Sequence, residues 1–246
     1  MGQSKRVALV TGSAAGIGRS VAWKLAERGY ALTVNYSKSQ VEAEETADGV
    51  RSRGGDLLLV QANVGDDASV RAMVATTVEH FGGLDVLVNN AATTHFIPHA
   101  DLDALTEPVW DSILQVNLKG TFYGCRAAMP HLKARSGNIV NIASVAGISG
   151  GGSSIAYAAS KGAVITLTKS LAKAFAPEVR VNAVAPGPVQ TRWLAGHQDM
   201  VADAMQLTPL KRPASADDVA DVVVFLADVT SLMTGQVVVI DGGRTI

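Results

Sequence analysis

Short apolar runs alternate with longer amphipathic stretches along the whole chain. The helical pattern is clearest between residues 70 and 81. Apolar side chains and one threonine fall there at i, i+3, i+4, i+7, i+8 and i+11: Val70, Met73, Val74, Thr77, Val78 and Phe81. This spacing places the side chains on one face of a helix. Helices are also predicted at about 17–28, 39–53, 108–134 and 154–176, and a last helix carries Val219, Val222, Val223 and Leu226.

Seven apolar runs between these helices predict buried strands, at residues 6–12, 31–36, 56–62, 84–90, 137–144, 180–187 and 236–243. Strands that are apolar on both faces are typical of parallel sheets covered by helices on both sides. Right-handed crossovers then give a doubly wound sheet. The pattern therefore predicts an α/β Rossmann fold with a mostly parallel, seven-stranded sheet. No linker interrupts it, so residues 1–246 are predicted to form a single domain.

The two longest irregular stretches, about 92–106 and 188–214, both follow the carboxyl end of a predicted strand. Open α/β sheets bind ligands at that edge, so both stretches are predicted to be substrate loops. Trp193 and Met205 either line an apolar lid there or anchor the loop. His95 and His99 have no third ligand near them in the sequence, so we expect loop residues and no metal site.

Composition narrows the function further. Charged residues are 17% of the chain and aromatic residues 5%, which indicates extensive burial within the fold or between subunits. The net charge is −1 with no basic block, so we expect no nucleic-acid partner. One cysteine, Cys125, fits a reducing compartment. We find no signal-peptide layout and no apolar run of membrane-spanning length, and we therefore expect a cytoplasmic protein without a membrane partner.

A glycine-rich turn, "VTGSAAGIGRS", joins the first strand to the first helix. Gly12 permits a tight turn, and Gly16 and Gly18 allow the backbone to approach a pyrophosphate at the positive helix N-terminus. The turn has no Gly-Lys-Ser/Thr ending, which argues against a phosphoryl-transfer P-loop. Nucleotide binding is the preferred interpretation.

The second strand ends in "VNYSKS". Folds that bind NAD usually place Asp or Glu here to grip the ribose 2′-hydroxyl, whereas Asn35 occupies this position in the present chain. Ser37 and Lys38 would attract a 2′-phosphate, which favours NADP(H) over NAD(H). The alternative is that Lys38 is a solvated loop charge.

Two further patterns are ambiguous when read alone. Asn89, Asn90 and Ala91 end the fourth strand and fit either turn chemistry or a cofactor wall. Tyr157 and Lys161 lie four residues apart and so share a helix face. Their ordinary pKa values of ~10 and ~10.4 make each inert as a base at pH 7.

Six motifs in order resemble the short-chain dehydrogenase/reductase family over the whole chain, and the terminal "IDGG" resembles its 3-oxoacyl-(acyl-carrier-protein) reductase-like branch. They are "TGSAAGIG", "NNAA", Asn117 in "LQVNLKG", Ser144 in "NIASVAG", Tyr157 with Lys161 in "YAASK", and "APGPVQT". The resemblance implies catalytic roles for Asn117, Ser144, Tyr157 and Lys161. Tyr157 would be the general acid or base, Lys161 would lower its pKa and bind the nicotinamide ribose, Ser144 would hydrogen-bond the substrate oxygen, and Asn117 would hold a water.

The turn chemistry and the resemblance together predict a set of cofactor contacts along the carboxyl edge of the sheet: Gly12, Ser13, Ala15, Gly16, Ile17, Gly18, Asn35, Tyr36, Ser37, Lys38, Asn63, Val64, Asn90, Ala91, Ala92, Tyr157, Lys161, Pro186, Gly187, Val189 and Thr191. Three positions depart from the family pattern. Ala92 replaces a Gly, Asn63 replaces an Asp that faces the adenine, and Ala15 stands where many NADP-using relatives carry a basic residue.

These observations lead to one preferred function and two alternatives. The preferred function is an NADP(H)-dependent oxidoreductase that transfers a hydride between the nicotinamide and a carbonyl or secondary alcohol. The alternatives are an NAD(H)-dependent alcohol dehydrogenase and a catalytically silent dinucleotide-binding regulator. The resemblance also implies a homotetramer. The sequence leaves the small-molecule substrate open among sugars, steroids and small ketones.

Overall fold

A computed structural model describes residues 5–197, 202–203 and 206–246. Its centre is a seven-stranded, all-parallel sheet in the order β3-β2-β1-β4-β5-β6-β7. The strands are β1 (Val7–Val10), β2 (Ala31–Tyr36), β3 (Leu57–Gln61), β4 (Val86–Asn89), β5 (Asn138–Ile142), β6 (Arg180–Pro186) and β7 (Val237–Ile240). The predicted Rossmann sheet is confirmed. Met205, named above as a lid or anchor residue, lies outside the described residues.

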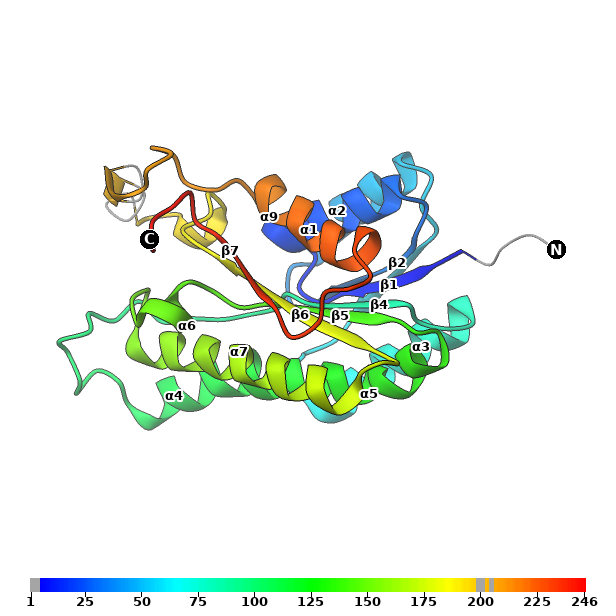
Figure 1. The fold of residues 1–246 in the computed structure, drawn as a ribbon, viewed down its shortest axis with the longest axis horizontal. Helices are drawn as coiled ribbons and strands as arrows, with labels where there is room; N and C mark the ends of the chain where they lie inside the picture. The colour runs from blue at the N-terminus through cyan, green and yellow to red at the C-terminus, as the bar shows by residue number, and fades with distance from the viewer. Residues whose placement is uncertain (1–4, 198–201, 204–205) are drawn as a thin grey trace.

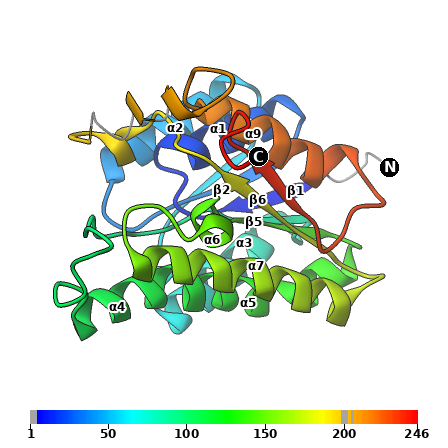
Figure 2. The ribbon, with the colours of Figure 1, turned by 60° about the vertical axis from the view of Figure 1, so that its left-hand side comes forward.

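Helices cover both faces of the sheet (Figures 1 and 2). One layer holds α1 (Gly16–Glu27), α2 (Gln40–Ser52) and α9 (Ala216–Val224), and the other holds α3 (Asp67–Phe81), α4 (Glu107–Leu114), α5 (Thr121–Ala134) and α7 (Ile155–Phe175). Every residue of β1, β2, β4 and β5 is buried. The two edge strands, β3 and β7, are mostly half-buried. The central strands are apolar on both faces because helices cover both sides of them.

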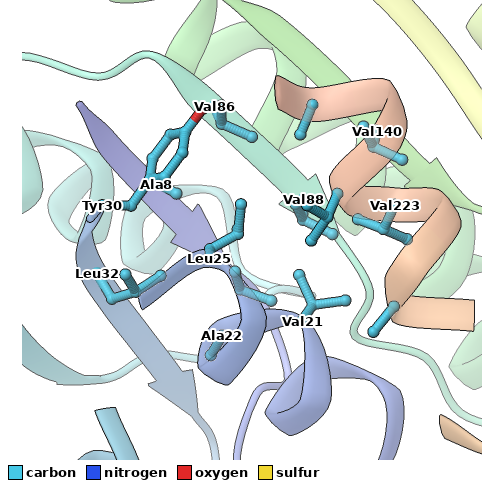
Figure 3. Close-up of a cluster of buried hydrophobic side chains, with 14 of the residues drawn as sticks. Ala8, Val21, Ala22, Leu25, Tyr30, Leu32, Val86, Val88, Val140 and Val223 are labelled. Atoms are coloured by element: carbon cyan, nitrogen blue, oxygen red, sulfur yellow. The ribbon is translucent and has the colours of Figure 1, made fainter. Parts of the chain in front are cut away.

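The core on the α1 and α9 side packs Leu25 and Val223 against Val88 and Val140 of the sheet (Figure 3). Tyr30 is the largest fully buried side chain, and its hydroxyl donates a 3.0 Å hydrogen bond to Asp228. Burial raises the pKa of this phenol above its usual range. The polar tip of Tyr30 is thereby satisfied inside an apolar cluster.

The long helix predicted at 108–134 is continuous in outline but changes its hydrogen-bonding in the middle. A π-helical segment, η1 (Gln115–Gly120), separates α4 from α5. A second π-helical segment, η3 (Phe225–Val229), extends α9. π-helical turns inside helices frequently mark functional sites, and η1 contains Asn117. Sequence periodicity did not predict it, because a segment of 6 residues is too short to define its own period.

Two short elements were not predicted, α6 (Ala146–Ser149) and the 3-10 turn η2 (Arg192–Leu194). Each follows the carboxyl end of a strand and is too short to show a helical spacing of apolar residues in the sequence. Within the described part of the chain, no helix is long and apolar enough to span a membrane.

Candidate active site

A cleft with a cavity volume of about 1260 Å³ runs along the carboxyl ends of the strands. Next to β1 the strand order reverses: the chain continues to β2 and β3 on one side of β1 and to β4 through β7 on the other. This switch point is the ligand-binding edge of a doubly wound sheet. Nearly all the predicted cofactor residues line the cleft, together with Ser144, Tyr157 and Lys161. Ser13, Gly18 and Asn117 do not line it, and their roles are described below.

The glycine-rich turn needs its glycines for two reasons. Gly12 and Gly16 adopt φ values of +61° and +58°, which side chains rarely tolerate. A Cβ at Gly18 would lie 2.5 Å from Asn90 Nδ2 and 2.7 Å from the Gly12 carbonyl oxygen. The turn can therefore pack closely against the end of β4 only because Gly18 has no side chain. The N-cap of α1 is Ala15, so no side chain caps the first-turn amides, a donor set that fits a pyrophosphate.

The side chain of Asn35 supports the glycine-rich turn through hydrogen bonds. It is 1% exposed, accepts a hydrogen bond from the Gly12 amide at 3.0 Å and donates to the Ala62 carbonyl at 3.1 Å. Ser13 is also buried and donates to the Val10 carbonyl at 2.7 Å. Both residues hold the shape of the cleft. The polar atoms of Asn35 are engaged by the protein, so Ser37 and Lys38, which are exposed at the rim, are the groups that face outward.

The two Asn residues at the end of β4, Asn89 and Asn90, have separate structural roles. Asn89 donates to Asn141 Oδ1 at 2.9 Å inside the core. Asn90 donates to the carbonyls of Thr11 and Gly12 at 2.9 and 3.0 Å and thereby joins β4 to the glycine-rich turn. The hydrogen bonds of Asn90 give the turn support, and Ala91 and Ala92 line the cleft immediately afterwards. The cofactor wall stays a prediction.

Asn63 and Val64 form the wall beyond β3. The Asn63 side-chain oxygen accepts a hydrogen bond from the Gly65 amide at 3.0 Å and closes a local turn. The residue that stands at the adenine-facing position of the family thus has a hydrogen-bond partner within the chain.

Tyr157 and Lys161 are brought to the cleft by the first turns of α7. Ser154 caps this helix and accepts a hydrogen bond from the Tyr157 amide at 3.2 Å. The Lys161 ammonium donates to the Ile142 carbonyl at 2.7 Å and is 5.8 Å from the centre of the Tyr157 ring. A Cβ at Gly147 would lie 2.5 Å from the Lys161 carbonyl carbon, so only glycine lets α6 approach α7 this closely.

The protein shifts the pKa values of these two groups in opposite directions. Burial raises the pKa of Tyr157 to about 12, against which its hydrogen bond with Ser144 acts. Burial also lowers the pKa of Lys161 to about 8. A depressed Tyr157 pKa was expected from the sequence, and the protein groups alone do not produce it. Burial is the larger effect and the hydrogen bond with Ser144 the smaller one, while the Lys161 ammonium donates to the Ile142 carbonyl.

Ser144 follows β5 and is placed beside the phenol by the turn that leads into α6. Its hydroxyl accepts a hydrogen bond from the Ala146 amide at 3.1 Å and lies 3.5 Å from the Pro186 carbonyl oxygen. The residue both caps the turn and lines the cleft, so the cap alone does not account for its position.

Asn117 is 1% exposed and has its side chain fully occupied. Its Oδ1 accepts from the Thr93 amide at 2.8 Å, and its Nδ2 donates to the Thr93 carbonyl and to Ser160 Oγ, both at 3.0 Å. The side chain therefore joins the loop after β4 to the helix that carries Tyr157. Both Nδ2 donors and one acceptor site of Oδ1 are used in this way, so the side chain has a positioning contact with both segments. The expected water-holding role stays a prediction, for which the second acceptor site of Oδ1 is available.

The lining also includes residues that the sequence analysis did not single out, among them Phe96, Arg192 and Arg244. These three lie in loops or in the short turn η2, where no motif signals a contact. The Phe96 ring stacks on His197 with centroids 3.6 Å apart, so the two predicted substrate loops meet. Trp193 lines the cleft with its ring 6.1 Å from that of Tyr157.

His95 and His99 lie outside the lining of the cleft. His95 is hydrogen-bonded to Ser112 at 3.1 Å, and His99 to the Gly152 carbonyl at 3.2 Å. Each ring thus fastens the first loop to a neighbouring segment. Over the residues that the structure describes, no cluster of His, Cys, Asp and Glu has the composition of a metal site.

Comparison with known proteins assigns the chain to a family. A family model described as Enoyl-(Acyl carrier protein) reductase matches residues 12–245. A candidate ketoacyl reductase of the granaticin polyketide synthase, from Streptomyces violaceoruber, is 48% identical over 96% of this chain and 95% of its own length. The chain belongs to the short-chain dehydrogenase/reductase family. It is therefore an oxidoreductase of the class that acts on CH–OH and C=O groups.

Two further short-chain dehydrogenases/reductases agree with this assignment. The 3-oxoacyl-(acyl-carrier-protein) reductase FabG of Staphylococcus aureus is 42% identical over 96% of both chains. A crystal structure of a candidate short-chain dehydrogenase/reductase from Burkholderia xenovorans superposes with a TM-score of 0.93 at 36% identity, and covers 99% of both chains. The likeness extends over the whole length of each relative, so the family assignment includes both substrate loops.

Proposed function

We propose that this short-chain dehydrogenase/reductase is an NADP(H)-dependent ketone reductase with Tyr157 as its general acid. The observation that carries the proposal is the convergence of Ser144, Tyr157 and Lys161 on the same cleft that the glycine-rich turn lines with Gly12 and Gly16. A nicotinamide cofactor bound along this cleft would supply the hydride. The groups of the chain itself then bind, orient and protonate the substrate.

The proton state of Tyr157 fits the reductive direction. Burial holds its pKa near 12, so the hydroxyl keeps its proton at neutral pH and can donate it to a carbonyl oxygen that gains negative charge. Ser144 lies beside Tyr157 and provides a second hydrogen bond for the same oxygen. Lys161, buried and directed at Ile142, supplies positive charge next to the phenol after its proton has left.

The preference for NADP(H) rests on the charges at the outer end of the cleft. Ser37 and Lys38 line it, and no carboxylate occupies the end of β2. Glu42, in the first turn of α2, is the carboxylate near this end, and it is engaged by Arg192 at 2.9 Å. An ammonium and hydroxyls favour a 2′-phosphate where a carboxylate would repel it.

For the substrate we propose a ketone of the 3-ketoacyl type. The relatives at 48% and 42% identity are both named as ketoacyl reductases. The substrate end of the cleft is lined by Phe96, Trp193 and Leu194, an apolar and aromatic surface that suits an acyl chain or ring. A charged sugar would find few partners among these three side chains.

The test is oxidation of NADPH, followed at 340 nm, with 3-ketoacyl thioesters and simple ketones as substrates and NADH in parallel. Turnover with NADPH that is lost in Tyr157→Phe supports the proposal. Cofactor binding measured by calorimetry, together with absence of turnover across the panel, would instead favour the silent regulator. The intact Ser144–Tyr157–Lys161 arrangement argues against that alternative.

We further propose that the protein acts as a cytoplasmic homotetramer. Phe225, Val229, Leu232 and Val239 are exposed apolar side chains on η3, on the loop that follows it and on β7, at the open edge of the sheet. An unpaired edge strand flanked by exposed apolar groups is a surface that a second copy would cover. Light scattering at micromolar concentration tests this, and a monomeric mass would contradict it.

A further inference from the structure

Arg192 crosses the outer end of the cleft. It follows Thr191, whose side chain lies 3.5 Å from the position of a Cβ on Gly16, so this segment passes directly over the glycine-rich turn. From there the guanidinium reaches α2 on the opposite side: Nη1 donates to Glu42 Oε1 at 2.9 Å, and Nη2 donates to Ser39 Oγ at 3.2 Å. A side chain of the second substrate loop is thus fastened to the helix that follows β2.

The polar side chains that line the cleft beside Arg192 make few strong interactions with other parts of the chain. Ser37, Lys38 and Ser39 line the cleft together with Arg192. Ser39 is the N-cap of α2, yet its hydroxyl makes no cap hydrogen bond. No ion pair is found for Lys38 among the described residues. The region therefore gathers two cationic side chains and two hydroxyls next to a helix N-terminus.

The other arginine near this end of the cleft is committed elsewhere. Arg19 donates to the Ala14 carbonyl at 2.8 Å, to Thr46 Oγ1 at 2.9 Å and to Glu45 at 2.9 Å, and it fixes α2 against the glycine-rich turn. Arg192 is different, because its side chain is 56% exposed and its partner Glu42 is 40% exposed. An exposed pair of this kind contributes little to stability and is easily exchanged.

We propose that Arg192 determines cofactor specificity by binding the 2′-phosphate of NADP(H), for which it exchanges Glu42. This inference rests on the proposed NADP(H) preference. The planar guanidinium fork matches a phosphate in two parallel hydrogen bonds, which Lys38 cannot provide as a point charge. Glu42 pairs with Arg192 when no 2′-phosphate is bound. Its negative charge opposes binding of the phosphate.

The experiment compares ligands that differ only in the 2′-phosphate. Dissociation constants are measured by calorimetry for NADP+ and NAD+, and for 2′,5′-ADP and 5′-AMP, with the wild-type protein and the variants Arg192→Ala, Arg192→Lys and Glu42→Gln. The matched control is Arg51→Ala, because Arg51 lies on α2, the helix that carries Glu42, pairs with Asp48 and faces solvent. It removes the same charge without altering the cleft.

Arg192→Ala is expected to weaken NADP+ and 2′,5′-ADP about tenfold, with NAD+ and 5′-AMP changed less than about twofold. Arg192→Lys should recover only part of the loss, and Glu42→Gln should tighten the two 2′-phosphorylated ligands severalfold. Arg51→Ala should leave all four affinities near wild type. Equal weakening of both ligands in each pair would overturn the inference, since Arg192 would then serve only to hold the loop. An unchanged set of affinities would overturn it as well.

The result also separates this inference from the proposed function. A wild-type protein that binds NAD+ as tightly as NADP+ contradicts the NADP(H) preference, whatever the variants do. A wild-type protein that prefers NADP+ by a ratio that Arg192→Ala leaves unchanged contradicts the role of Arg192 alone.

Discussion

The Lys161 ammonium lies 5.8 Å from the centre of the Tyr157 ring, and burial shifts the pKa values of the two groups toward their uncharged forms. The lysine pKa falls to about 8 and the tyrosine pKa rises to about 12. At neutral pH the pair is therefore a cation beside a protonated phenol. That state fits the proposed role of Tyr157 as a general acid, in which the nearby cation would stabilise the phenolate that remains.

Removal of the phenol hydroxyl tests this directly. Tyr157→Phe should lower kcat for ketone reduction by about 10³-fold, within the usual range for loss of a general acid, and should leave the dissociation constant for NADPH nearly unchanged. Steady-state kinetics and calorimetry measure the two effects. Tyr123→Phe is the control, since Tyr123 lies on α5 outside the cleft. Turnover near wild type in Tyr157→Phe would remove Tyr157 from the chemistry.

The depressed lysine pKa also predicts a pH dependence of stability. Lys161 is 3% exposed, and its folded-state pKa of about 8 lies below the ordinary 10.5. The native state therefore holds fewer protons than the unfolded state between these values, so the free energy of unfolding of the wild type rises with pH in this window. Below pH 8 the buried charge destabilises the protein, and Lys161→Met escapes this penalty.

Accordingly, the stability advantage of Lys161→Met over wild type should be largest below pH 8 and shrink by about 3 kcal/mol as the pH approaches 10.5. Urea unfolding across the pH range measures it. Lys169→Met, an exposed position on the same helix, controls for the change in side-chain type. A difference between Lys161→Met and wild type that stays constant from pH 6 to 10 would show that the ammonium is not desolvated. Lys161→Met should also weaken cofactor binding, because the lysine lines the cleft.

The glycine-rich turn has no room for a methyl group at Gly18. Gly18→Ala would place a Cβ 2.5 Å from Asn90 Nδ2 and 2.7 Å from a backbone oxygen, so the turn must shift away from β4. We expect NADPH binding to weaken more than tenfold, with a lower melting temperature. Gly151 lines the cleft, and Gly151→Ala meets nothing nearer than 3.6 Å and should change neither property appreciably. Unaltered NADPH affinity in Gly18→Ala would mean that the tight approach of turn and strand is unnecessary.

Asn117 offers a test of positioning. Asn117→Leu keeps the volume but leaves the Thr93 amide and the Ser160 hydroxyl without their buried partner. The free energy of unfolding should fall by about 2 kcal/mol, as expected for an unsatisfied buried donor. Activity should fall while KM for NADPH changes little, because α7 and the loop after β4 lose their link. Thr76→Ala, on the exposed face of α3, is the control, with a change within about 0.5 kcal/mol. Full retention of stability in Asn117→Leu would contradict the assigned hydrogen bonds.

Several features of the fold and site followed from the sequence because they are local. Apolar runs such as 31–36 predict buried strands, since both faces of a central parallel strand meet helices. The glycine spacing in 12–18 predicts the turn, because only glycine adopts its backbone angles and tolerates its close contacts. The i, i+4 placement of Tyr157 and Lys161 follows from helix geometry alone.

Other features depend on contacts between distant segments, and only the tertiary structure decided them. Asn35 was read as a ribose-facing residue, but its amide is engaged by Gly12 and Ala62, whose positions the strand order sets. The Tyr157 pKa was expected to fall, but burial among elements far apart in the chain raises it. The salt bridge between Arg192 and Glu42 spans 150 residues and belongs to no motif. Sequence patterns determined which groups are present at the sheet edge, whereas desolvation and long-range hydrogen bonding determined what each group is free to do.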